Sequence, residues 1–183
     1  MTSAESRALV VVATPEEAVH VPAGLRHVVT GIGKTAAAHV TTRAILEERP
    51  SHVVNIGSAG ALRDGLTGLF EIGTVLNHDM NGEAIRSLGY DPRDTLELGG
   101  SEVVLATGDL FVADGAVRRR LAAHAHLVDM EGYAVAYVAQ ELGVPVTLLK
   151  HVSDNADESA WDWPDVVELS ARALGERLGD LAR

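Results

Sequence analysis

Acidic side chains follow two apolar stretches of the sequence, at positions where they could bind or activate a small molecule. Asp129-Met130-Glu131-Gly132 closes one such stretch and precedes an alanine-rich segment. Lys150-His151-Val152-Ser153-Asp154-Asn155 follows the second, Pro145–Leu149. Each acid alone is typical of a helix cap or a turn. Capping does not explain why Asp129 and Glu131 flank Met130 at the end of a predicted strand, the place where α/β sheets bind ligands.

A third acidic motif, Thr14-Pro15-Glu16-Glu17, follows the first apolar stretch. It matches a capping box, in which Glu17 reaches back to the backbone amide of Thr14. Such boxes are common helix starts, so by itself the motif favours a capping role for Glu17.

Two glycine-containing turns follow predicted strands. Gly31-Ile32-Gly33-Lys34-Thr35-Ala36 fits the relaxed dinucleotide fingerprint, but the next strand ends in Asn55-Ile56-Gly57 rather than in an acid. A Rossmann oxidoreductase is therefore a weak alternative, and the spacing excludes a P-loop. Gly57-Ser58-Ala59-Gly60 predicts a tight turn out of the sheet, whose backbone amides could approach a ligand.

Charge and composition narrow the possible partners. The net charge of −11 disfavours nucleic acid and anionic membranes, and Arg118-Arg119-Arg120 is interpreted as the solvated face of a helix. Without cysteine there is no disulfide and no thiolate metal site, and the eight histidines show no metal-ligand spacing. The N-terminus carries no signal-like or membrane-spanning run. We therefore expect a cytoplasmic protein that binds a neutral small molecule.

Short β-branched runs alternate with helical stretches along the whole chain, which predicts a single α/β domain over residues 1–183. We expect three α/β/α layers around a mixed, mostly parallel sheet. The predicted strands are Ala8–Ala13, Arg26–Thr30, His52–Gly57, Ile72–Asn77, Glu102–Thr107, His126–Met130 and Val146–His151. The predicted helices are Pro15–His20, Lys34–Glu48, Asp114–Ala123, Glu131–Leu142 and Pro164–Leu181.

Taken together, five motifs at the predicted strand ends resemble the nucleoside phosphorylase–nucleosidase superfamily, specifically its 5′-methylthioadenosine/S-adenosylhomocysteine nucleosidases. Their order and spacing hold over nearly the whole chain. They are Thr30-Gly31-Ile32-Gly33-Lys34, Asn55-Ile56-Gly57-Ser58-Ala59-Gly60, Gly108-Asp109-Leu110-Phe111, Val128-Asp129-Met130-Glu131 and Val152-Ser153-Asp154-Asn155-Ala156-Asp157.

The resemblance implies roles on the side of the leaving base. Asp154 is the acid that protonates purine N7, and Ser153 steadies it. Phe111 stacks on the base, and the backbone of Val112 reads its edge. An acid here suits glycosidic cleavage, which passes through an oxocarbenium-like state.

The same resemblance implies roles on the side of the sugar. Glu131 grips the ribose 2′- and 3′-hydroxyls, and Met130 lies against the sugar. Ser58 and Glu17 flank the attacking water, with Glu17 as general base. The implied reaction needs no cofactor or metal, and the resemblance also implies a homodimer. Leu62–Phe70 and Leu88–Tyr90 are candidates for its contact.

The chain departs from the family pattern in places that concern the 5′-substituent. The hairpin before Arg26–Thr30 is shortened, and so is the region around Asn77–Tyr90. Lys150 stands where the nucleosidases have arginine. The usual phenylalanine beyond the Ser-Asp motif has no counterpart, so Trp161 or Trp163 is expected to cover the base.

Several functions remain open at this stage. A phosphorylase would bind phosphate, normally through arginine, yet this chain has Asn55 and Glu17 in the relevant segments. We therefore favour hydrolysis, with a purine nucleoside phosphorylase or a non-catalytic nucleoside-binding protein as alternatives. Methylthioadenosine, S-adenosylhomocysteine, 5′-deoxyadenosine and adenosine are all possible substrates.

Overall fold

Strand β1 (Ala8–Val12) is buried on both of its faces, and this places it inside a layered structure. The computed structural model describes residues 8–181 of the chain. Leu9 and Val11 pack against helices on one side of the sheet, whereas Val10 and Val12 pack against a helix on the other side. A strand covered on both faces requires apolar residues at every position, which explains the unbroken run Leu9–Val12.

The strands form one mixed sheet in the order β2-β1-β3-β8-β7-β5-β6, with β9 pairing β3 and β4. Five pairings are parallel, and β3–β8, β4–β9 and β5–β6 are antiparallel. The bounds are β2 Arg26–Val29, β3 His52–Ala61, β4 Leu69–Glu71, β5 Thr74–Asn77, β6 Thr95–Glu97, β7 Val104–Thr107, β8 Leu127–Asp129 and β9 Val146–Asp154.

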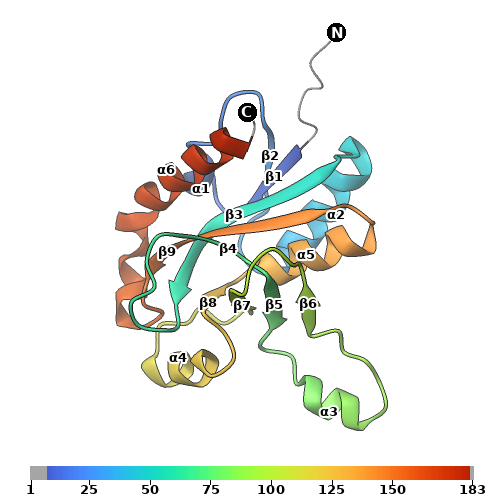
Figure 1. The fold of residues 1–183 in the computed structure, drawn as a ribbon, viewed down its shortest axis with the longest axis vertical. Helices are drawn as coiled ribbons and strands as arrows, with labels where there is room; N and C mark the ends of the chain where they lie inside the picture. Colours follow the sequence, from blue (N-terminus) through green and yellow to red (C-terminus); the bar gives the residue numbers. More distant parts are fainter. Residues whose placement is uncertain (1–7, 182–183) are drawn as a thin grey trace.

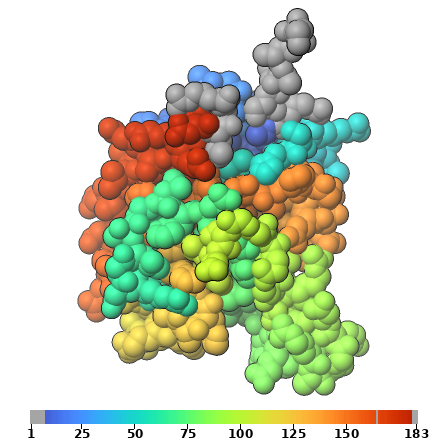
Figure 2. Space-filling view, viewed as in Figure 1, coloured from blue at the N-terminus to red at the C-terminus, as the bar shows by residue number. Residues whose placement is uncertain are grey.

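Helices cover both faces of this sheet, so the predicted three-layer α/β/α class is confirmed (Figure 1). Helices α2 (Lys34–Glu48) and α5 (Gly132–Glu141) pack together on one face. The long helix α6 (Trp163–Leu181) covers the other face beside α1 (Pro15–Ala18). Helices α3 (Gly82–Ser87) and α4 (Gly115–Ala122) lie at one end of the sheet, and α3 projects from the body of the molecule (Figure 2).

Each predicted helix and strand has an observed counterpart, but the sequence did not indicate four short elements. These are β4, β6, α3 and the 3₁₀ helix η1 (Glu158–Asp162). Strands β4 and β6 have only three residues each, which is too short for a clear alternating pattern. Residues 1–7 and 182–183 of the predicted domain, and the side chain of Leu181, lie outside the described part.

Two surface interpretations need correction. Arg118 is not simply solvated, because its guanidinium donates to the Ala61 carbonyl oxygen at 3.1 Å and pairs with Asp64 at 2.8 Å. Leu62, at one end of a candidate dimer contact, is buried in the core with Ala106 and Val128. It is therefore not available for an intermolecular contact.

Candidate active site

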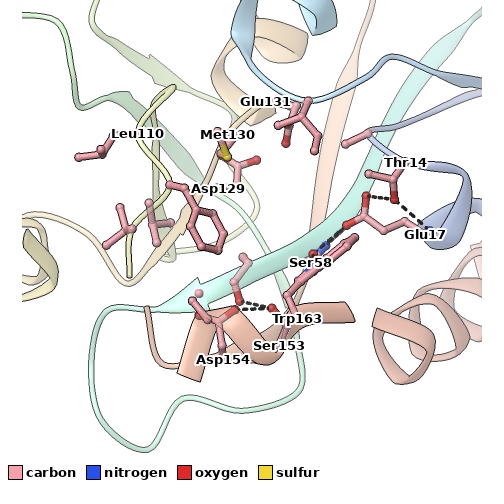
Figure 3. A pocket seen from close by; sticks show the side chains of 18 of the residues that line it. Thr14, Glu17, Ser58, Leu110, Asp129, Met130, Glu131, Ser153, Asp154 and Trp163 are labelled. Carbon is pink, nitrogen blue, oxygen red and sulfur yellow. Dashed lines mark hydrogen bonds between the residues drawn. The ribbon is translucent and has the colours of Figure 1, made fainter. Parts of the chain in front are cut away.

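One pocket lies where the ends of β3, β8 and β9 meet the start of α1, and Figure 3 shows its labelled side chains surrounding a common cavity. All eight residues that the sequence analysis assigned to a site line this pocket. They are Glu17, Ser58, Phe111, Val112, Met130, Glu131, Ser153 and Asp154. They come from segments far apart in the chain, so the fold brings them together.

The prediction of a turn at Gly57-Ser58-Ala59-Gly60 is wrong. This segment is part of the ten-residue strand β3. The pairing register with β9 shifts between Ala59 and Gly60. A Cβ atom at Gly60 would lie 2.9 Å from the Oδ1 atom of Asp154 and 2.9 Å from the Cβ atom of Ala156. Glycine is therefore required here because the segment that carries Asp154 approaches the backbone of β3 so closely.

Glu17 is 3% exposed, and its carboxylate is directed at β3 (Figure 3). Its Oε1 atom accepts hydrogen bonds from the backbone N–H and from the hydroxyl of Ser58, both at 2.8 Å. The helix cap is also present, since the Thr14 hydroxyl accepts from the backbone N–H of Glu17 at 3.3 Å. The N-cap by Thr14 is therefore confirmed, but the predicted return bond from the Glu17 side chain to the Thr14 amide is not observed, because that carboxylate is directed to Ser58 and the pocket.

Glu131 precedes α5, is 8% exposed, and accepts a hydrogen bond from the backbone N–H of Gly33 at 2.8 Å. The next amide, that of Lys34, donates to Asp109 at 2.8 Å. In a dinucleotide-binding protein the N-terminus of this helix would face a phosphate. Here two carboxylates of the protein occupy it, which argues against the Rossmann oxidoreductase.

Lys34 joins the glycine turn to the loop that carries the predicted base-binding residues. Its ammonium donates to Asn77 at 2.7 Å and is paired with Asp79. Asp79 in turn accepts from the backbone N–H of Asp109 at 2.8 Å. These contacts link the turn at Gly33 to the loop that carries Phe111 and Val112.

Asp129 pairs with Lys150, whose ammonium lies 2.9 Å from the aspartate in the interior of the domain. Asp129 also accepts from the Thr107 hydroxyl at 2.5 Å and from the backbone N–H of Gly132 at 2.8 Å. Burial alone would lower the pKa of Lys150, but Asp129, Glu131 and Glu17 raise it above its usual value. Lys150 therefore remains a buried cation behind the acidic pocket, and Asp129 supports the start of α5.

Asp154 is the last residue of β9 and is held by two donors. The Ser153 hydroxyl donates to its Oδ2 atom at 2.7 Å, and the backbone N–H of Ala156 donates to its Oδ1 atom at 2.7 Å. Ser153 therefore contacts Asp154 directly, and its steadying role stays a prediction.

Three aromatic side chains line the pocket, namely Phe111, Trp161 and Trp163. Phe111 and Trp161 have ring centroids 5.2 Å apart with their planes tilted by 58°. Trp161 is 70% exposed, whereas the Trp163 indole N–H donates to the Ser58 hydroxyl at 2.7 Å. The two tryptophans therefore have different environments, and Trp161 is the one beside the predicted base-stacking residue.

The sequence analysis missed several lining residues. Thr14 and Asp129 were noted only as part of local motifs, and Ile32 and Leu110 only as members of quoted runs. Ala13, Ala59, Gly60, Val128 and Ala160 complete the lining. Small and aliphatic residues carry no chemical signal of their own, so only the family pattern could have placed them.

Within residues 8–181, no three His, Asp or Glu side chains are arranged to hold a metal ion. No helix in this part of the chain is long and apolar enough to cross a membrane.

Glu131 makes the stability of the domain dependent on pH. Burial, reinforced by Asp129, raises the pKa of Glu131 from 4.5 to about 7. The folded state therefore holds a proton between pH 4.5 and 7 that the unfolded chain releases, so stability falls as pH rises through this window. Relative to Glu131→Gln, we expect the wild type to lose about 3 kcal/mol of unfolding free energy between pH 4.5 and 8.

Denaturant unfolding of both proteins across this pH range measures the difference. The other titrating groups are common to the two proteins, so the difference reports Glu131 together with its interactions with Asp129 and Lys150. Parallel stability curves would show that Glu131 does not retain its proton near neutral pH.

Comparison with known proteins identifies the family of this chain. A sequence model of the family described as the phosphorylase superfamily matches residues 25–92 and 98–182, so the chain belongs to that family.

Two relatives within this family are named as nucleosidases. The aminodeoxyfutalosine nucleosidase of Helicobacter pylori is 33% identical over 172 residues, covering 80% of this chain and 75% of the relative. The 5′-methylthioadenosine/S-adenosylhomocysteine nucleosidase of Shewanella oneidensis is 30% identical over 157 residues, covering 72% of this chain. The matched region spans 66% of that relative's length.

Solved structures show the same fold. The H. pylori 5′-methylthioadenosine/S-adenosylhomocysteine nucleosidase, in complex with a substituted pyrrolidin-3-ol, superposes with a TM-score of 0.85 at 26% identity. The superposition covers 95% of this chain and 96% of that one. Another structure of the H. pylori enzyme, with an aspartate changed to asparagine, holds 5′-methylthioadenosine in its active site.

Proposed function

We propose that the protein is a cytoplasmic nucleosidase that hydrolyses the N-glycosidic bond of an adenine nucleoside, 5′-methylthioadenosine or a related 5′-modified adenosine. One observation carries the choice of hydrolysis over phosphorolysis. Of the described residues that line the pocket, four are acidic and none is a lysine, arginine or histidine. Phosphate therefore has no cation in this lining to bind, whereas water is neutral and can be activated by a carboxylate.

The two sides of the pocket supply the two proton transfers that hydrolysis needs. Asp154 donates a proton to N7 of the purine while the bond between N9 and C1′ breaks, and the bonding electrons leave with the base. Water attacks C1′ and transfers a proton to Glu17. The products are the free base and the sugar with a hydroxyl at C1′. The oxocarbenium-like character of the transition state suits the negative charge of Glu131 nearby.

The remaining lining residues position the substrate. Above its pKa of about 7, Glu131 is ionised and accepts hydrogen bonds from the ribose hydroxyls, because an ionised carboxylate is purely an acceptor. Met130 lies against the sugar, Phe111 stacks on the base, and the backbone of Val112 reads the base edge. The nucleosidase relatives support this assignment, since one binds 5′-methylthioadenosine in its active site.

The first test is an assay of base release without phosphate. We expect free adenine from at least one nucleoside in a panel of methylthioadenosine, S-adenosylhomocysteine, 5′-deoxyadenosine, adenosine and aminodeoxyfutalosine. The rate should not rise when phosphate is added, because the lining offers phosphate no cation. Chromatography of the base and of the sugar product measures both.

Strict dependence on phosphate, with a sugar 1-phosphate as product, would instead establish the phosphorylase. Nucleoside binding with no product from any member of the panel would establish the non-catalytic alternative.

We also propose that the protein acts as a homodimer. Leu88 and Tyr90, just beyond α3, are 74% and 71% exposed and lie in one of the two predicted contact regions. Ile32 and Leu110 at the pocket are exposed as well. Apolar surface of this kind is typical of a protein–protein contact, and a second copy would cover it.

A further inference from the structure

Trp163 reaches the pocket from the first residue of α6 and contacts the serine that holds Glu17 (Figure 3). Its indole N–H donates to the Ser58 hydroxyl oxygen at 2.7 Å. The Ser58 hydroxyl donates in turn to the Oε1 atom of Glu17 at 2.8 Å. Three residues from α6, β3 and α1 therefore form one chain of hydrogen bonds.

The direction of this chain follows from the chemistry of its members. An indole N–H can only donate, and a hydroxyl has a single proton. Because Trp163 donates to the oxygen of Ser58, the proton of Ser58 is directed to Glu17. The backbone N–H of Ser58 donates to the same Oε1 atom at 2.8 Å, so this oxygen has two fixed donors.

The other oxygen of Glu17 is held less tightly. Its Oε2 atom has the Thr14 hydroxyl at 3.4 Å, a long contact for an O–H donor. The fixed Oε1 atom therefore leaves Oε2 as the oxygen able to accept a proton from water. The orientation of the carboxylate depends on Ser58, and the orientation of the Ser58 hydroxyl depends on Trp163.

We propose that Trp163 is a positioning residue for Glu17, acting through Ser58. This inference rests on the proposed hydrolysis, in which Glu17 accepts the proton of the attacking water. The proposal gives different roles to the two tryptophans that the sequence analysis considered as covers for the purine. Trp161 lies beside Phe111, whereas Trp163 orients Glu17, the general base that activates water.

The kinetic test compares Trp163→Phe with the matched variant Trp161→Phe. Trp163→Phe keeps an aromatic ring and removes the N–H donor. We expect kcat to fall about 3- to 10-fold with KM changed less than twofold, the effect of losing one neutral hydrogen bond. Trp161→Phe should act mainly on KM. An unchanged kcat in Trp163→Phe, or an effect confined to KM, would overturn the proposal.

A spectroscopic test does not depend on activity. The chain has two tryptophans, so ¹⁵N-labelled protein shows two indole N–H resonances, which the two Phe variants assign. We expect the Trp163 resonance to exchange slowly with solvent and to shift in Ser58→Ala, while the Trp161 resonance stays in place. A Trp163 resonance that exchanges as fast as that of Trp161 and ignores Ser58→Ala would rule out the contact.

The two tests separate failure of the inference from failure of the proposed function. A wild-type protein that releases no base would reject the function and with it the positioning role, even if the resonances confirm the contact. An active wild type with an unchanged Trp163→Phe variant would reject the positioning role alone. Circular dichroism and melting curves of each variant show whether a lower rate reflects lost fold.

Discussion

Replacing Asp154 by asparagine is expected to lower kcat by about 10²–10⁴-fold while nucleoside binding persists. Asparagine has the same shape, so its side-chain oxygen can still accept from the backbone N–H of Ala156 and hold the segment in place. It cannot deliver a proton, so the purine would have to leave as an anion. Steady-state kinetics give the rate, and calorimetry with a non-hydrolysable nucleoside analogue gives the affinity.

Asp157→Asn is the matched control for this variant. Asp157 lies three residues further along and caps η1, with its Oδ1 atom accepting from the backbone N–H of Ser159 at 3.0 Å. It does not belong to the pocket lining, and asparagine caps helices well. We expect its turnover to match the wild type. Equal losses in the two variants would mean that Asp154 supports structure rather than proton transfer.

The sequence was most informative where a local pattern determines the structure. Helix α2 has the predicted bounds, because it begins after the Gly31–Gly33 turn and ends at Glu48, and its C-cap residue Arg49 is followed by a proline. Arg49 adopts a left-handed conformation with φ of 49°, typical of a helix end. The apolar strands β1 and β3 were also recognisable from their composition.

Contacts between distant segments were beyond local patterns. Gly57–Gly60 have the composition of a turn, but β9 pairs with all four residues and β8 pairs with Gly60, and these pairings keep the segment in the sheet. The motif Thr14–Glu17 correctly predicted a cap, yet nothing local shows that the Glu17 side chain instead reaches Ser58, 41 residues away. The Trp163 contact spans 105 residues and was unpredictable for the same reason.

The resemblance supplied what local patterns could not. It grouped eight residues from five segments into one site, and the structure places all eight around one pocket. Their individual roles remain proposals, because proximity shows only that each residue can reach a substrate. Asp129 illustrates the difference, since it lines the pocket while its carboxylate pairs with Lys150 and supports α5.

Replacing Glu17 by glutamine is expected to reduce kcat by about 10²–10⁴-fold with little change in melting temperature. The side-chain oxygen of glutamine can still accept from both donors of Ser58, but an amide cannot take a proton from water. The helix cap is unaffected, because it uses the backbone N–H of residue 17. Activity per folded molecule and thermal unfolding of the same sample measure the two effects.

Glu16→Gln makes the same chemical change one residue earlier and separates catalysis from the effect of charge. Glu16 is exposed, lies in the same first turn of α1, and is outside the pocket lining. Either change removes one negative charge from the first turn of α1, where the helix dipole favours such a charge. If charge at this helix end were all that mattered, both variants would behave alike. We expect Glu16→Gln to remain fully active, and a Glu17→Gln protein of equal activity would exclude Glu17 as the general base.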